Sequence, residues 1–214
     1  KIIELMRNWY DSESGEYITK TRLEVKGLGQ AKYILKEGGS MGDLYTTSDL
    51  RHNDAGDIEI DNAGSVSIQD NLPDMKLGSV FPKYNLSWRN SFAYKGISLS
   101  ALVTARIGGI AYSATQANMD MFGVSEASAA ARDAGGVLVN GRTMVDPEMW
   151  YTTIGAQSGL PQYYTYSATN VRLQELSVSY TIPRRWLRVC DITVSLVGRN
   201  LWMMYCKAPF DPEA

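Results

Sequence analysis

The residue types that most often perform catalysis or bind metal ions are sparse in this sequence of 214 residues. It contains one histidine, His52, and two cysteines, Cys190 and Cys206. A single histidine excludes most zinc sites, and it leaves only His52 as the base of a histidine-dependent catalytic triad. No cysteine or second histidine stands near His52 in the sequence. We therefore expect no metal site there and no catalytic residues in the chain.

An acidic segment, Asp57-Ile-Glu-Ile-Asp61, could offer oxygen ligands to a calcium ion. It lacks the ligand spacing and the glycine of an EF-hand loop. The sequences Asp54-Ala-Gly56 and Asn62-Ala-Gly64 flank the segment, and aspartate, asparagine and glycine favour tight turns. We therefore predict a hairpin at this segment.

A group of aromatic residues in the second half of the chain has chemistry suited to contacting a solute. Tryptophan and tyrosine rings can stack on the faces of sugars or contact a partner protein, and they can also pin a long loop to the body of a protein. The sequence leaves these roles open. The candidate contact residues are Trp150, Tyr151, Tyr163 and Tyr164.

The composition narrows the classes of protein to which the chain can belong. With 44% hydrophobic and 21% charged residues it is expected to fold, because disordered chains are poorer in apolar residues. Lysine and arginine (21) nearly balance aspartate and glutamate (23), which excludes nucleic-acid binding through bulk positive charge. The 13 tyrosines and 5 tryptophans outnumber the 4 phenylalanines. Tyrosine and tryptophan are favoured where one end of the ring is dry and the other wet, as at membrane interfaces and sugar-binding surfaces.

Apolar and polar residues alternate along several segments, which predicts antiparallel strands and an all-β fold. The clearest two strands are joined by the short turn Lys95-Gly96 and form a predicted hairpin. No stretch approaches the roughly 18 apolar residues of a transmembrane helix, so this chain could cross a membrane only with strands. The predicted strands span approximately 20–27, 30–36, 86–95, 97–107, 170–182 and 191–201.

The predicted strands fit two architectures. In a large transmembrane β-barrel their apolar face would meet lipid, and their polar face, rich in serine, threonine and arginine, would line a watery lumen. In a soluble sandwich the apolar face would cover a core. The connections favour the barrel, because the turns at 95–96 and 183–190 are short whereas the loops at about 37–85 and 108–169 are long. Short turns then lie at one end of the barrel and long extracellular loops at the other.

Three arginines occupy polar positions of the predicted strands. In a barrel their side chains would face the lumen, where they could contact a solute or pair with acidic groups of a plug domain. These lumen-facing candidates are Arg89, Arg106 and Arg199.

The two cysteines lie on either side of the predicted strand 191–201. At ~3.3 Å per residue that strand would hold them about 35 Å apart, whereas a disulfide needs Cα atoms within about 7 Å. We therefore predict that Cys190 and Cys206 are free thiols.

Six segments of the chain resemble, in the same order, segments of the SusC/RagA family of TonB-linked outer-membrane transporters of Bacteroidetes. The longest of them, Tyr163–Pro183, is similar to a signature of the late barrel strands in that family. The order of the six segments carries the resemblance. They are Glu37–Tyr45, Asp54–Asp61, Asn85–Phe92, Tyr163–Pro183, Val194–Trp202 and Ala208–Glu213.

The resemblance implies that the chain is part of the barrel of a longer transporter in the outer membrane of a Gram-negative bacterium. The plug domain, most of the strands and the strand expected after Glu213 would lie outside these residues. Such a transporter imports a nutrient, here a glycan or peptide fragment, together with a SusD-like surface lipoprotein. The TonB–ExbB–ExbD complex would supply energy through the plug, and outer-membrane lipid would surround the strands. The resemblance implies no covalent chemistry, so we expect neither an enzyme nor a cofactor.

Two other functions remain open on the sequence. A secreted soluble β-sandwich could bind carbohydrate through its tyrosines, and a surface adhesin could have similar strands without transporting a solute. Six strands are too few to close a barrel, because the smallest membrane barrels have about eight. We therefore expect the remaining strands of the barrel to accompany these in the complete protein.

Overall fold

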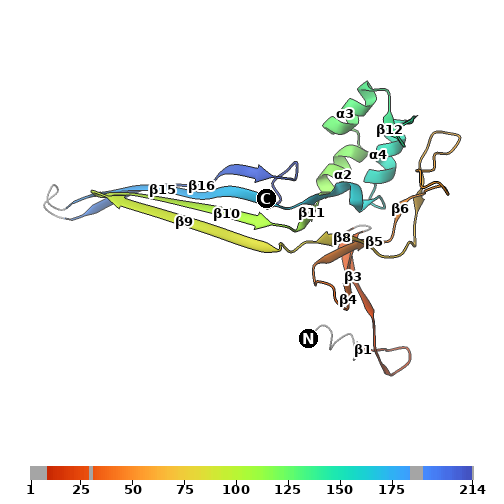
Figure 1. Ribbon diagram of the computed structural model, residues 1–214, viewed down its shortest axis with the longest axis horizontal. Helices are drawn as coiled ribbons and strands as arrows, with labels where there is room; N and C mark the ends of the chain where they lie inside the picture. The colour runs from red at the N-terminus through yellow and green to blue at the C-terminus, as the bar shows by residue number, and fades with distance from the viewer. Residues whose placement is uncertain (1–8, 29–30, 184–189, 214) are drawn as a thin grey trace. The chain divides into compact units, whose positions relative to one another are not determined.

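The computed structural model describes residues 9–28, 31–183 and 190–213 (Figure 1). Strands account for 48% of the structure and helices for 15%, and the sheets are antiparallel, which confirms the predicted all-β class. The chain divides into two compact units, residues 1–80 with 112–165 and residues 81–111 with 166–214. Within the described ranges, no helix has the length and apolar character needed to span a membrane.

The second unit is built on one sheet of four long antiparallel strands (Figure 1). Neighbouring strands follow the order β16-β15-β10-β9. The turn between β9 and β10 has positive φ at Lys95 (48°) and Gly96 (86°), which is the geometry of tight hairpin turns whose twist matches that of the strands. The four strands are β9 (Tyr84–Tyr94), β10 (Ile97–Ile107), β15 (Asn170–Ile182) and β16 (Ile192–Cys206).

The bounds of β16 differ most from the predicted strand 191–201, because β16 continues to Cys206. The segment Leu201–Tyr205 is apolar without alternation, so its sequence gives no period-2 signal. The ladder nevertheless continues there, with Trp202 opposite Leu173 and register shifts that mark bulges. By contrast, β10 and β15 have the predicted bounds.

The first unit contains a second four-stranded sheet in the order β3-β4-β5-β8. Its strands are β3 (Arg22–Leu28), β4 (Ala31–Lys36), β5 (Asp43–Thr46) and β8 (Met75–Ser79). Two-residue strands add the pairs β1 (Trp9–Tyr10) with β2 (Tyr17–Ile18) and β6 (Asp49–Leu50) with β7 (Ile68–Gln69). The connection predicted as a loop at 37–85 is therefore folded. Its strands were missed because two to five residues complete too few periods for alternation to be recognised.

Asp74, the residue before β8, forms ion pairs with basic side chains of β3 and β4. Its carboxylate accepts hydrogen bonds from Arg22 Nε at 2.9 Å and lies 2.6 Å from Lys36 Nζ. The hydrogen bond from Arg22 is the largest influence on Asp74, and together with Lys36 it outweighs the burial that would favour the neutral form. The pKa of Asp74 is consequently lowered to about 2.

We expect this carboxylate to make stability depend on pH in the acid range. A carboxyl whose pKa falls on folding stabilises the folded state above its unfolded value of about 4, and this contribution is lost as pH falls toward 2. Because Arg22 and Lys36 are about one-third exposed, their interaction with Asp74 is screened by solvent. We therefore expect the Asp74 carboxylate to contribute roughly 1 kcal/mol to the free energy of unfolding. Between pH 5 and pH 2 the melting temperature of the native protein should therefore fall more steeply than that of Asp74→Asn. Parallel curves would contradict this assignment.

The connection predicted as a loop at 108–169 is also folded, and it contains the helices found among the described residues (Figure 1). Each α-helix begins at a side-chain cap: Ser113 accepts from Gln116 N, Ser125 from Ser128 N, and Asp146 from Glu148 N. The elements are β11 (Ile110–Tyr112), α2 (Ala114–Met121), α3 (Glu126–Asp133), β12 (Val137–Val139), β13 (Thr143–Val145), α4 (Pro147–Gly155), the 3₁₀ helix η1 (Pro161–Tyr164) and β14 (Thr165–Ser167).

The two connections predicted as separate loops share one hydrophobic core. Leu50 and Val66 come from the first connection, and the remaining members come from the second. Gly155 brings α4 close to α2, since a Cβ at this position would lie 2.7 Å from the carbonyl oxygen of Ala117. The buried members are Leu50, Val66, Ala117, Val139, Val145, Trp150, Ile154, Leu160 and Tyr164. We call this cluster the helical core.

The acidic segment at 57–61 forms the predicted hairpin-like structure. His52 pairs with Ile58 and Ile60 pairs with Val66 as isolated antiparallel bridges. Asp61 closes the turn, because its carboxylate accepts from the backbone N–H groups of Ala63 and Ser65. This carboxylate therefore serves a turn, and the His52 side chain is exposed.

Candidate functional site

One face of the long sheet carries mainly apolar side chains, and many of them are exposed. The register places Trp88, Val103, Leu173 and Trp202 in one row across all four strands. The outermost members of this row are about two-thirds exposed, Trp88 at 65% and Trp202 at 63%. A second row consists of Phe92, Leu99, Val178 and Leu196. We call this surface the apolar face.

Aromatic side chains lie toward both ends of the apolar face. Tyr94 and Tyr180 flank Ile97 in the row next to the β9–β10 turn. Tyr84 and Tyr205 lie toward the opposite end of the sheet. From Tyr84 to Tyr94 the strand extends ~33 Å, or ~25 Å across a bilayer at a tilt of ~40°. This matches the height of the apolar band, bounded by aromatic girdles, in membrane-spanning barrels.

The opposite face of the sheet is polar and carries the three predicted arginines. Arg89 of β9 and Arg199 of β16 both approach Glu175 of β15, at 3.9 and 3.5 Å. Glu175 shares a row with both arginines, because Leu102 pairs with Arg89 on one side and with Glu175 on the other. Arg89 and Arg199 are 59% and 77% exposed, so these ion pairs contribute little to stability and leave both guanidinium groups accessible.

The third predicted arginine, Arg106, belongs to a cluster that includes one residue missed by sequence reasoning, Arg172. The Arg172 side chain is only 6% exposed. Its Nη2 donates to Asp211 Oδ1 at 2.6 Å and lies 3.3 Å from Glu213 Oε2. Arg106 Nη1 lies 3.9 Å from Glu213 Oε1, and Asn170 Nδ2 donates to the same oxygen at 3.2 Å.

Residues 207–213, which we call the strap, return from the end of β16 to this cluster. Burial by itself would raise the pKa of Asp211, but the hydrogen bonds from Arg172 and from the Glu213 backbone, with the positive charge of Arg172, lower it overall. Asp211 is therefore a carboxylate at neutral pH and pairs with Arg172 as an ion. The sequence contains a signal for this cluster, because the acidic segment Asp211-Pro-Glu213 follows the strand that pairs with β15. The sequence does not indicate which arginine these acidic side chains contact.

The four aromatic candidates divide into buried and accessible residues. Trp150 and Tyr164 belong to the helical core and are 9% and 2% exposed, so in this structure they pack the core and present little surface to a solute. Tyr163 is 38% exposed and meets Trp150 edge to face, with ring centroids 6.0 Å apart. Tyr151 is half-buried. Only Tyr151 and Tyr163 are thus accessible for contact.

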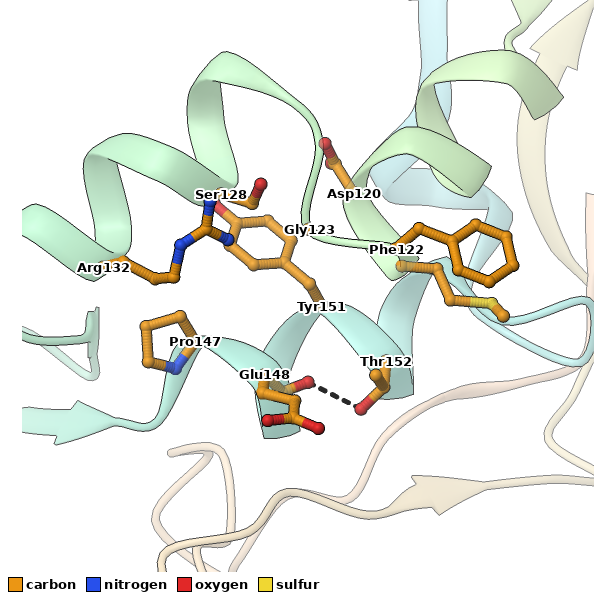
Figure 2. Close-up of a pocket in the computed structure, with 10 residues that line it drawn as sticks. Asp120, Phe122, Gly123, Ser128, Arg132, Pro147, Glu148, Tyr151 and Thr152 are labelled. Carbon is orange, nitrogen blue, oxygen red and sulfur yellow. Dashed lines mark hydrogen bonds between the residues drawn. The ribbon is translucent and has the colours of Figure 1, made fainter.

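Tyr151 lines a pocket of about 330 Å³ between α2, α3 and α4 (Figure 2). It projects from α4 toward Ser128 and Arg132 of α3, and Glu148 lies on the same helix as Tyr151. Burial, and secondarily the negative charge of Asp120, raise the pKa of Tyr151, so its hydroxyl remains a donor at neutral pH. The pocket therefore offers charges of both signs and a phenolic donor.

The two cysteines are free, as predicted. Cys190 is exposed, and Cys206, at the end of β16, has its Sγ 3.4 Å from the carbonyl oxygen of Phe210 in the strap. The length of β16 separates the two residues, and this separation is the reason for which free thiols are predicted.

Comparison with known proteins gave no match to a family model and no match among curated proteins. Among solved structures, the chain is similar to a chain in "Structure of the RagAB peptide importer in the 'closed-closed' state", with 16% sequence identity and a TM-score of 0.47. The alignment covers 90% of this chain and 26% of that chain. The present chain thus spans about a quarter of the length of that one.

Proposed function

We propose that this chain contributes membrane-spanning strands to an outer-membrane transporter that imports a nutrient. The observation that carries the proposal is the exposed apolar face, which is backed by a polar face across the same four strands. Because the order of six sequence segments resembles the SusC/RagA family, we propose the TonB-dependent type, energised by TonB–ExbB–ExbD through a plug domain. The solute would be a glycan or peptide fragment, delivered with a SusD-like lipoprotein. The proposed role is transport without covalent chemistry.

The physical chemistry of the two faces supports this role. Tryptophan, leucine and tyrosine side chains that are half to three-quarters exposed would favour aggregation in water, but they are stabilised in lipid. Within the sheet the backbone N–H and C=O groups pair between strands, as a strand must do in hydrocarbon. Serine, threonine, arginine and glutamate on the other face suit a water-filled lumen.

The soluble sandwich makes a different demand on the same sheet. In that architecture a second sheet would cover the apolar face and pack about 10 Å away from it. Residues such as Leu196, which is 78% exposed, would then be buried. The exposure of this face favours the membrane proposal over the carbohydrate-binding sandwich. Tyr151 and Tyr163 stay candidates for contact with a solute or with the lipoprotein.

A pair of neighbouring positions on β10 tests the proposal. The background is the complete protein with Cys190→Ser and Cys206→Ser. Leu99→Cys and Ser100→Cys are introduced into it separately. Each variant is labelled with an environment-sensitive fluorophore and reconstituted in lipid. Leu99 lies on the apolar face, and Ser100, next to it, lies on the polar face. We expect nitroxide-bearing acyl chains to quench the probe at 99 strongly and the probe at 100 weakly. Water-soluble iodide should give the reverse order.

Two results would count against this function. Equal quenching of both probes by the lipid would mean that the two faces do not differ in lipid contact. A complete protein that stays monodisperse without detergent, with the probe at 99 shielded from both quenchers, would favour the soluble sandwich.

A further inference from the structure

The cluster around Arg172 has the composition of a carboxylate-binding site, and the strap fills it. Two arginines, Arg106 of β10 and Arg172 of β15, and one amide, Asn170, face the carboxylates of Asp211 and Glu213. Arginine is suited to this task because its planar group offers paired N–H donors that match the two oxygens of a carboxylate. The strap thus supplies, from the chain itself, the kind of group that this site recognises.

The strap uses the donors of Arg172 incompletely. Nη2 serves both acids, Nη1 reaches Asp211 only at 3.4 Å, and the buried Nε has no acceptor among the described residues. A buried donor without an acceptor costs free energy, because it has lost its hydrogen bonds to water. A carboxylate that approached Arg172 from the side would accept from Nε and Nη2 together, as in the common two-bond pairing of this side chain.

There is room for an acidic group beside the strap, next to Arg106. A pocket of about 280 Å³ on the polar side of the sheet is lined by Arg106 and Glu213 together with Asn85, Ser87, Thr104 and Gln174. This volume is near the lower limit for small-molecule sites, about 300 Å³. It therefore suits a single acidic unit, either an acidic residue of a peptide or a uronic acid unit of a glycan.

The acidic side chains of the strap are partly open to water and can turn away from the arginines. The anchor of the strap is Phe210, whose ring meets Tyr166 edge to face with centroids 5.5 Å apart, near the buried Ala208. Beyond the anchor, Asp211 and Glu213 are 38% and 32% exposed. A solute can therefore approach these carboxylates from water, whereas Arg172 is reached only when they move.

We propose that Arg106 and Arg172 form a carboxylate-binding site that the strap closes with Asp211 and Glu213 and that a carboxylate-bearing solute opens by competition. As part of a solute path the site rests on the transport function proposed above. Binding itself does not, and it is measured without transport and without a bilayer. Failure of one proposal therefore does not imply failure of the other.

Binding to the complete protein in detergent tests the site. The probes are triglutamate and trigalacturonate, with triglutamine as the neutral control. We expect the variant that combines Asp211→Asn with Glu213→Gln to bind at least one acidic probe ten-fold or more tightly than the native protein does. The tighter probe identifies the peptide or glycan source. Arg106→Gln in the double variant should remove much of the gain, whereas Arg199→Gln, which is on the same face but outside the site, should retain it.

Cys206 provides a second readout that leaves the strap and both arginines unchanged. Its half-buried Sγ lies 3.4 Å from the carbonyl oxygen of Phe210, which is part of the peptide bond to Asp211. Displacement of Asp211 should therefore move this carbonyl group and expose the thiol, although the Phe210 ring stays in place. In Cys190→Ser protein, an acidic probe should accelerate maleimide labelling of Cys206, and triglutamine should not. The proposal is overturned if the double variant gains no affinity, if triglutamine gains equally, if Arg199→Gln abolishes the gain as fully as Arg106→Gln, or if labelling of Cys206 ignores the acidic probes.

Discussion

Replacing Trp150 by alanine is expected to destabilise the helical core by about 3–5 kcal/mol, the usual range for removing a large buried aromatic side chain. Trp150 is 9% exposed, and the edge of one ring meets Tyr163. Small domains are typically stable by only about 5–15 kcal/mol. The loss would therefore be a large part of the stability of residues 113–165, and their helices should open far more often than in the native protein.

Hydrogen exchange in the complete protein measures this effect locally. Amides in α2 and α4 should exchange faster in Trp150→Ala, and those of β10 should be unchanged. Met149→Ala is the matched control, because Met149 precedes Trp150 on α4 but is 48% exposed, and we expect it to cost less than about 0.5 kcal/mol. If both variants exchange alike, the core role of Trp150 is wrong. If Trp150→Ala lost solute or partner binding with native exchange rates, Trp150 would instead be a contact residue.

The long strands could be read from the sequence because their pattern is local and repeated. In β10, six apolar residues alternate with five others over eleven positions, and only Leu102 breaks the polar set. Such a run has one satisfactory register, since a shift by one residue would exchange the two faces. Alternation in β15 fails near Gln174, and the structure explains this by the bulge between Leu173 and Glu175, which keeps Leu173 and Leu176 on the apolar face.

The helical core could not be read in the same way. Leu50 and Ile154 belong to one cluster although about a hundred residues separate them in the chain. The strands that position Leu50 have two residues each, which is too short for any periodicity. The folded character of 37–85 and 108–169 thus depends on contacts between segments, whereas the sequence pattern reports only neighbours within a segment.

The candidate site was predicted in part for a similar reason. The positions of Arg89, Arg106 and Arg199 on the polar face follow from alternation alone. The burial of Arg172 depends on the strap, which returns to β15 only after the whole of β16 has been formed. Likewise, the difference between Trp150, which is buried, and Tyr163, which is accessible, depends on how η1 packs.

Placing arginine at the middle of the apolar face is the other substitution from which we expect a large effect. Leu176 lies in the row of Asn90, Ala101 and Gly198, about midway between the aromatic ends. On a lipid-facing strand, arginine at the bilayer midplane costs about 2–4 kcal/mol, whereas near the interfaces it costs about 0–1 kcal/mol. Leu176→Arg should therefore reduce the folding equilibrium constant in lipid about 30- to 700-fold, at 1.4 kcal/mol for each factor of ten.

Two matched controls separate lipid contact from simple burial. Ser177→Arg, next along β15 on the polar face, should cost little because its side chain would face the water-filled lumen of the proposed barrel. Tyr180→Arg lies on the apolar face but in the row beside the β9–β10 turn, where a long cationic side chain can reach the headgroups. Refolding of the complete protein into lipid vesicles, followed as the folded fraction in urea, should rank the losses as Leu176→Arg well above Tyr180→Arg and Ser177→Arg. A sandwich core would penalise arginine at both 176 and 180, because depth in a bilayer plays no part there, so equal large losses at these two positions would refute the membrane assignment.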